Sequence, residues 1–253
     1  MSAIAIACLV FVCCFGAALA GMVLHARLPD RHLDGNSKET VRLVMGLIAT
    51  MAALVLGLLI ASANSTYDTQ ATELQQMSAD VAQLDRMLVL YGPEAQQSRN
   101  VLRQAVTAAH ERIWATGSSQ LVNLDPALGR AQADAFFAML QNLAPKTAAQ
   151  TRAQDTAWQL AASLTQIRML MYQQLGKSVS WPLLAVLIFW VSVLFMGFGL
   201  FARFQISLIV TLLIGALSVV GAIFLIVELN KPYSGLIRLS DAPIRSALAT
   251  MDR

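Results

Sequence analysis

The chain has 253 residues, of which 57% are hydrophobic and only 13% are charged, and its formal net charge is +3. A soluble domain is typically closer to half apolar and about a quarter charged. The composition therefore excludes an ordinary soluble protein and indicates a membrane protein whose main partner is the lipid bilayer.

Four windows contain no Asp, Glu, Lys or Arg: Ala3–Leu24, Leu43–Ala63, Trp181–Ala202 and Phe204–Val227. Each has roughly 20 residues, about the length of a helix that crosses the hydrocarbon core of a bilayer. Because lipid cannot satisfy backbone polar groups, these windows predict four transmembrane helices. We expect the first helix to be retained and not cleaved as a signal peptide, since its arginines follow the apolar run.

Residues 25–42 separate the first two windows and have the composition of a short charged loop. Asn36 and Glu39 resemble a capping box, which predicts the start of the second helix. Two arginines follow the first helix closely and no charged side chain precedes it. This charge pattern favours an outside N-terminus, and it places residues 64–180 outside the cytoplasm.

Residues 64–180 predict an extramembrane helical bundle. Apolar residues recur on two heptad positions from Tyr67 to Tyr91, so the second helix is predicted to continue out of the membrane. Gly92 then terminates this helix and Pro93 opens the next. Further helices are expected around 102–113, 133–140 and 153–171. The segment has nine acidic and nine basic residues, and a neutral surface argues against nucleic acid as a partner.

Two predicted spans carry stripes of small and hydroxyl residues at helical spacing. Such stripes allow helix backbones to approach closely, and the hydroxyl groups can bond across helices. Two interpretations stay open: tight packing within one subunit, or a subunit contact or pore lining in a homo-oligomer. The second span carries Gly46, Thr50, Ala53, Gly57 and Ala61, and the fourth carries Ser207, Thr211, Gly215, Ser218 and Ala222.

Charged residues and histidine are absent from the depth of all four spans. This disfavours an ion-coupled transporter and leaves room for a passive pore. Glu228, at the end of the fourth span, is interpreted as an interfacial ion-pair partner of Lys231 or as a ring of charge at a pore mouth. The sequence contains no nucleophile elbow, phosphate loop or acid pair, so we expect no enzymatic activity, no cofactor and no metal.

Residues 230–253 form an amphipathic tail after the hairpin of spans three and four, residues 181–229. Leu236, Leu239 and Ile244 stand among sparse arginines, which predicts a segment that lies on the membrane surface. Asp241 is expected to cap a last short helix. The three cysteines lie in the first window, so no disulfide framework is expected.

These features predict an all-α polytopic membrane protein with four spans and a helical bundle between spans two and three. The strings "LPDRHL", "SKETVRLVMGLIATMAALVLGLLIASA", "SWPLL", "FGLFA" and "GAIFLIVELNKPYSGLIRLSDAPIRSAL" resemble an uncharacterised bacterial membrane family catalogued as bestrophin-like. The resemblance covers nearly the whole chain. It implies kinship with bestrophins, which are pentameric anion channels whose second membrane helix lines the pore.

Two hypotheses for function follow. The first is a homo-oligomeric passive channel or channel-like conduit for small inorganic ions in the bacterial inner membrane, lined by the small residues of the second span. The second is a membrane-anchored helical-bundle sensor or interaction module that associates through heptad residues such as Leu84.

Overall fold

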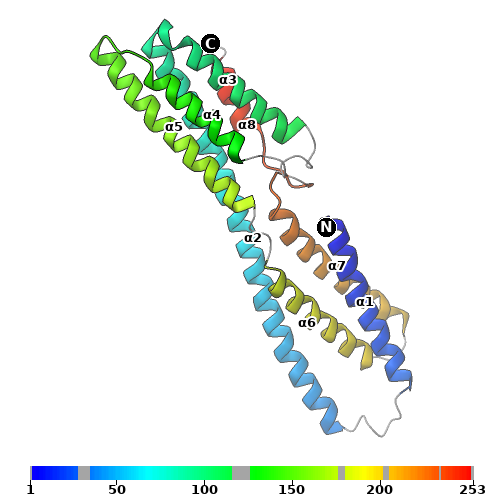
Figure 1. Cartoon of the computed structure of the whole chain (residues 1–253). Helices are drawn as coiled ribbons and strands as arrows, with labels where there is room; N and C mark the ends of the chain where they lie inside the picture. Colours follow the sequence, from blue (N-terminus) through cyan, green and yellow to red (C-terminus); the bar gives the residue numbers. More distant parts are fainter. Residues whose placement is uncertain are drawn as a thin grey trace. The chain divides into compact units, whose positions relative to one another are not determined.

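The polypeptide is helical throughout, and its helices divide into two compact units (Figure 1). The structure is a computed structural model that describes residues 2–27, 35–115, 126–175, 180–201, 205–233 and 235–251. The first unit comprises Met1–Thr66 and Ser178–Asn230, and the second comprises Tyr67–Lys177 and Lys231–Arg253. The predicted all-α class is confirmed: four helices could cross a membrane, and α3 to α5 lie between the second and third of them in the sequence.

The first unit contains the four candidate spans. These are α1 (Ala3–Arg27), the first part of α2 (Gly35–Tyr91), α6 (Trp181–Leu200) and α7 (Ile206–Leu229). Pro182 lies in the first turn of α6, where a missing backbone N–H costs nothing. Four helices with the length and composition of membrane spans are therefore present, as predicted. The bounds of α1, α6 and α7 differ from the charge-free windows by a few residues, whereas α2 extends far beyond its window.

Helix α1 packs against α6 and α7 in the first unit (Figure 1). A Cβ atom on Gly21 of α1 would overlap the carbonyl oxygen of Met196, and one on Gly199 of α6 would overlap that of Ala18. The two backbones therefore touch where glycine removes the side chain, as in other close crossings of membrane helices. Val10 and Cys14 continue this buried face of α1.

The second unit begins where α2 continues beyond its apolar part to Tyr91. Gly92 has φ 118°, in the region that favours glycine, and Pro93 then opens a 3-10 turn. The predicted end of the helix is thus confirmed, as is its predicted continuation past residue 63. The remaining helices of this unit are α3 (Gln96–His110), α4 (Pro126–Gln141), α5 (Ala148–Leu175) and α8 (Ala242–Met251).

Helix α5 runs antiparallel to the second part of α2 (Figure 1), and three hydrogen bonds set this register. Gln150 Nε2 donates to the carbonyl of Tyr91 at 3.0 Å. Further along, the Ser163 hydroxyl donates to Asp80 Oδ2 and Gln174 Nε2 donates to Glu73 Oε1, both at 2.7 Å. As the residue numbers fall along α2 they rise along α5.

The heptad residues of α2 form the core of the second unit. Leu74, Leu84 and Leu88 are at most 2% exposed, and even the polar heptad member Gln70 is 4% exposed. Leu102 of α3 belongs to the same buried cluster as Leu84 and Leu88. The heptad pattern therefore describes packing inside one chain, so Leu84 does not present a surface for association.

The tail differs from its prediction. Leu239 and Ile244, expected on a membrane surface, are buried against Leu74 and Tyr233 in the second unit. The reason is that α8 offers its apolar face to helices of this unit, so lipid is not needed to cover it. Helix α8 does begin directly after Asp241.

Two predictions concern parts of the chain outside the described residues. They are the charges of loop residues 28–34 and the side chain of the expected cap Asn36.

Candidate functional site

The small-residue stripe of α2 faces outward from its own chain. All five members, Gly46, Thr50, Ala53, Gly57 and Ala61, are exposed. A Cβ atom on Gly46 or Gly57 would meet no atom within 4 Å. In the single chain no described helix of the first unit therefore covers this stripe, and its role as a subunit contact or pore lining stays a prediction.

The stripe is one of three faces of the apolar part of α2. The buried face contains Met45, Ala52 and Leu59, and Met45 packs on Gly197 of α6. A second exposed face carries large apolar side chains: Leu47 at 62%, Leu54 at 73% and Leu58 at 59% exposure. At 3.6 residues per turn, the stripe is centred roughly 140° from the buried face and roughly 80° from the large apolar face. The stripe is thus a separate exposed surface beside a surface suited to lipid.

Three hydroxyl groups of the two stripes, those of Thr50, Thr211 and Ser218, bond within their own helices. Thr50 Oγ1 donates to the carbonyl of Leu47 at 2.8 Å. Thr211 Oγ1 and Ser218 Oγ donate to carbonyls four residues earlier, at 3.0 and 2.9 Å. Their protons are therefore satisfied inside a bilayer, and each oxygen keeps a free lone pair.

The stripe of α7 is only partly exposed. Ser207, Thr211 and Ser218 are exposed, whereas Gly215 and Ala222 are half-buried. A Cβ atom on Gly215 would touch the ring of Phe195 at 3.4 Å. This stripe therefore serves packing within the first unit along one edge. Glu228, at the end of α7, is only 2% exposed, so in the single chain its carboxylate is enclosed and does not extend an exposed stripe.

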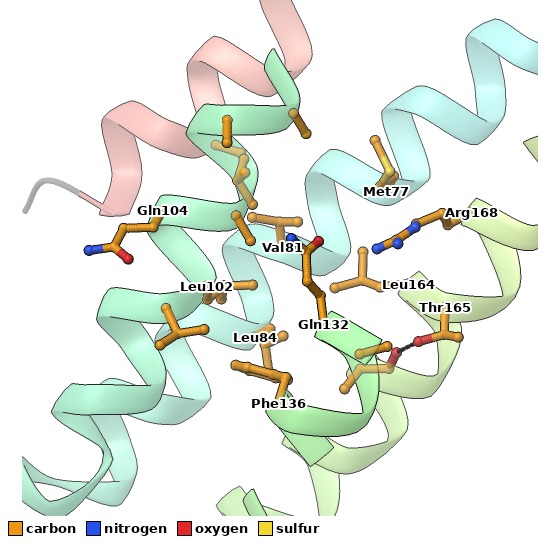
Figure 2. A pocket seen from close by; sticks show the side chains of 18 of the residues that line it. Met77, Val81, Leu84, Leu102, Gln104, Gln132, Phe136, Leu164, Thr165 and Arg168 are labelled. Atoms are coloured by element: carbon orange, nitrogen blue, oxygen red, sulfur yellow. Dashed lines mark hydrogen bonds between the residues drawn. The ribbon is translucent and has the colours of Figure 1, made fainter. Parts of the chain in front are cut away.

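The second unit contains a cavity of about 490 Å³ that sequence reasoning did not locate (Figure 2). Its apolar wall includes Leu84, Leu102 and Phe136 from α2, α3 and α4. Few polar side chains reach it, and among them are Arg112 and Arg168. This volume is in the range of small-molecule sites, which are mostly apolar with a few placed polar groups.

Arg112 lies in a π-helical turn, Glu111–Ala115, that follows α3. Such turns insert an extra residue into a helix and occur often at functional sites. No sequence signal available in a single chain marked this turn or the cavity, because both depend on how helices distant in sequence meet.

The structure offers no metal centre among the residues that it describes: no group of three or more His, Cys, Asp or Glu side chains is placed to hold an ion. His110 has Nε2 3.0 Å from Asp241 Oδ2 and stacks on Trp114. With Arg245 bonded to the same carboxylate, this cluster fastens α8 to α3 and needs no metal to explain it.

The fold and these surfaces define a class: an all-α membrane protein with four candidate spans and a helical unit that carries a cavity. Within this class, the chain belongs to the bestrophin-like family, because the family model of the bestrophin-like domain matches residues 12–244. The resemblance found in the sequence is thereby confirmed. No curated protein and no solved structure matches the chain.

Proposed function

We propose that this chain is the subunit of a homo-oligomeric passive conduit for small inorganic ions, in which the α2 stripe faces the other subunits or the pore. The observation that carries the proposal is the exposure of all five stripe residues, with nothing within 4 Å of a Cβ on Gly46 or Gly57. The family membership adds to it, since the family is named for its likeness to a class of channels.

The physical argument concerns what covers an exposed small-residue surface in a bilayer. Lipid chains pack poorly into the shallow groove that glycine and alanine leave, whereas a helix of a second copy can approach closely there. A water-filled pore is the other environment that accepts a surface of glycine, alanine and threonine. Both require several subunits around one axis, so oligomerisation is the first consequence of the proposal.

The first experiment is native mass spectrometry of the full chain in lipid nanodiscs. Four or more copies per particle are expected, because a central pore between subunits needs a ring. One or two copies would contradict the proposal, since the stripe would then have no shared axis to line.

The second experiment is ion flux into liposomes with the variant Gly57→Leu. The added side chain should project into the shared space and reduce flux at least tenfold while the subunit count stays unchanged. Gly16→Leu is the matched control, because Gly16 is an exposed glycine of α1 that also has nothing within 4 Å of its Cβ. Equal flux in Gly57→Leu and the control would remove α2 from the pore.

We further propose the bacterial inner membrane as the location, with the second unit outside the cytoplasm. The support is the two arginines, Arg27 and Arg31, that follow the apolar run of α1, and the absence of basic residues before this run. A cysteine at the exposed position Gln97 of α3 should react with a membrane-impermeant maleimide in intact spheroplasts. Reaction only after lysis would reverse the orientation.

A second candidate function is a membrane-anchored, non-catalytic sensor, and the cavity of the second unit favours it. In this version the heptad residues stabilise the sensor unit and do not bind a partner, because Leu84 is fully buried. A protein that is monomeric in nanodiscs but binds a ligand in the cavity would support this candidate over the conduit.

A further inference from the structure

The cavity of the second unit is built by five helices and has an apolar interior. Its wall is contributed by α2, α3, α4, α5 and α8, with Val81, Leu164 and Ile244 among the side chains that face it. An apolar space of about 490 Å³ corresponds to about 16 water-sized units of volume at about 30 Å³ each. A space of this chemistry gains more from a hydrocarbon occupant than from water.

The charged groups at the cavity are all of one sign. Among the described residues that line it there are two arginines, Arg112 and Arg168, and no aspartate or glutamate. The remaining polar side chains at the wall are neutral, such as Gln132 and Thr165. An occupant with one anionic group therefore complements the cavity, whereas a cation does not.

Arg168 is held at this position by a glycine. A Cβ atom on Gly129 of α4 would overlap the guanidinium of Arg168, so only glycine leaves room for it there. The guanidinium carbon also lies 5.9 Å from the centre of the Tyr172 ring. In Figure 2 the guanidinium of Arg168 points into the cavity, with Met77 and Leu164 beside it.

The same contact makes Arg168 a favourable anion partner. Gly129 lies in the first turn of α4, which begins at Pro126, and the N-terminal end of a helix carries a partial positive charge. The guanidinium and this helix end are therefore two positive groups side by side. An anion bound to the cavity side of the guanidinium would be attracted by both, and a planar guanidinium can hold a carboxylate through two hydrogen bonds.

We propose that the cavity binds a single-chain amphiphile with a carboxylate head and a hydrocarbon tail of about twelve carbons, a size that the volume estimate accommodates. The carboxylate bonds to Arg168, and the side-chain amide of Gln132 is a further hydrogen-bond donor on the cavity wall. The tail lies among Leu84, Leu102 and Phe136. This inference does not depend on ion conduction, and it assigns the cavity a ligand class whichever proposed function is correct.

The test uses the full chain in nanodiscs and a dodecanoic acid that carries a photoreactive diazirine near the end of its tail. Cross-linked peptides are mapped by mass spectrometry, and the label is expected on cavity-lining segments of α3, α4 and α5. Dodecanoate should compete for this labelling, and dodecanol, which lacks the charge, should compete at least tenfold more weakly. Empty nanodiscs measure the share of the probe that dissolves in lipid.

Three variants test the named contacts. Arg168→Gln should weaken competition by dodecanoate tenfold or more, and Arg168→Lys, which keeps the charge, should weaken it less. Ala133→Phe should reduce labelling by filling the space from α4, since Ala133 lines the wall. Arg130→Gln is the matched control, because Arg130 is an exposed arginine next to Gly129 that is not part of the wall.

Each outcome bears on the proposal. Labelling of the cavity that falls in Arg168→Gln and Ala133→Phe but not in Arg130→Gln supports it. Labelling confined to the four candidate spans would overturn it, as would cavity labelling that is the same in all variants. Equal competition by dodecanol and dodecanoate would overturn the assignment of the carboxylate to Arg168. If the protein shows no ion flux in liposomes but the labelling results are as expected, only the proposed conduit is refuted and the ligand proposal stands.

Discussion

The ion pair between Arg99 and Asp85 ties three helices of the second unit together. Arg99 Nε donates to Asp85 Oδ1 at 2.6 Å, and Nη2 donates to Asp85 Oδ2 at 3.1 Å. Nη2 also donates to the carbonyl of Met251 at 2.8 Å, at the last residue of α8. The hydrogen bond to Asp85 raises the pKa of Arg99, so the guanidinium stays charged at any pH at which the protein is folded.

The variant Arg99→Met would leave the carboxylate of Asp85 without its cation. The Asp85 side chain is 7% exposed and that of Arg99 is 22% exposed. Removing one partner of a fully buried pair costs about 3–5 kcal/mol, and partial access of water places this case near the lower end, at about 3 kcal/mol. A change of this size corresponds to roughly a hundredfold shift in an opening equilibrium.

Hydrogen exchange of the full chain in nanodiscs measures this shift locally. Amides of residues 242–251 should exchange roughly a hundredfold faster in Arg99→Met, because the unpaired carboxylate of Asp85 favours opened states of the second unit in which water reaches it. Arg86→Met is the matched control, since Arg86 is an exposed arginine on α2. The double variant Asp85→Leu with Arg99→Met should recover most of the protection, because no unpaired charge remains. Exchange in Arg99→Met within threefold of the parent protein would refute the reasoning.

Two further predictions concern the contact of α1 with α6 and the contact of α8 with α3. Gly199→Leu should abolish the yield of folded protein, because its Cβ would overlap the backbone of α1. Gly16→Leu is the matched control. A normal yield of monodisperse Gly199→Leu protein would contradict the close crossing of α1 and α6. Asp241 has a pKa below its usual range, first because of its hydrogen bond to His110 and then because of Arg245. Since its folded pKa is lowered, it stabilises α8 above its unfolded pKa, and this contribution is lost as the pH falls through the folded pKa. In Asp241→Asn, the hydrogen-exchange protection of residues 242–251, corrected for intrinsic rates, should depend less on pH in the acid range. The same pH dependence in the variant and the parent protein would exclude Asp241 as its source.

The elements of the fold could be predicted because their signals are local. Gly92 and Pro93 end α2 through their own backbone preferences, and charge-free windows mark spans by composition alone. The environment of each face could not be predicted in this way. Ala18 of α1 and Ala53 of α2 are the same residue type in charge-free helices, yet Ala18 is fully buried and Ala53 is exposed. A helical period identifies a face, and only the tertiary arrangement decides what lies opposite.

The cavity is even harder to predict from the sequence than the environment of a helix face. Gly129 and Arg168 are each ordinary in the sequence, and their contact exists only because α4 and α5 meet at that level. The tail was misassigned for a related reason. Its apolar residues predict an amphipathic surface segment equally well whether lipid or protein covers them, and here protein does, through Leu239 and Ile244.

The division of the second unit into two stretches of sequence has a consequence for biosynthesis. Residues 67–177 leave the ribosome well before 242–251, and α6 and α7 must be inserted in between. Until α8 emerges, the side chains that Ala247 and Met251 later cover stay accessible to solvent, to chaperones and to proteases. Domains generally complete as their segments emerge. In this protein, α8 can complete the second unit only after α6 and α7 have been synthesised. If translation stops within α6 or α7, the second unit lacks α8, and its exposed apolar side chains become a target for quality control.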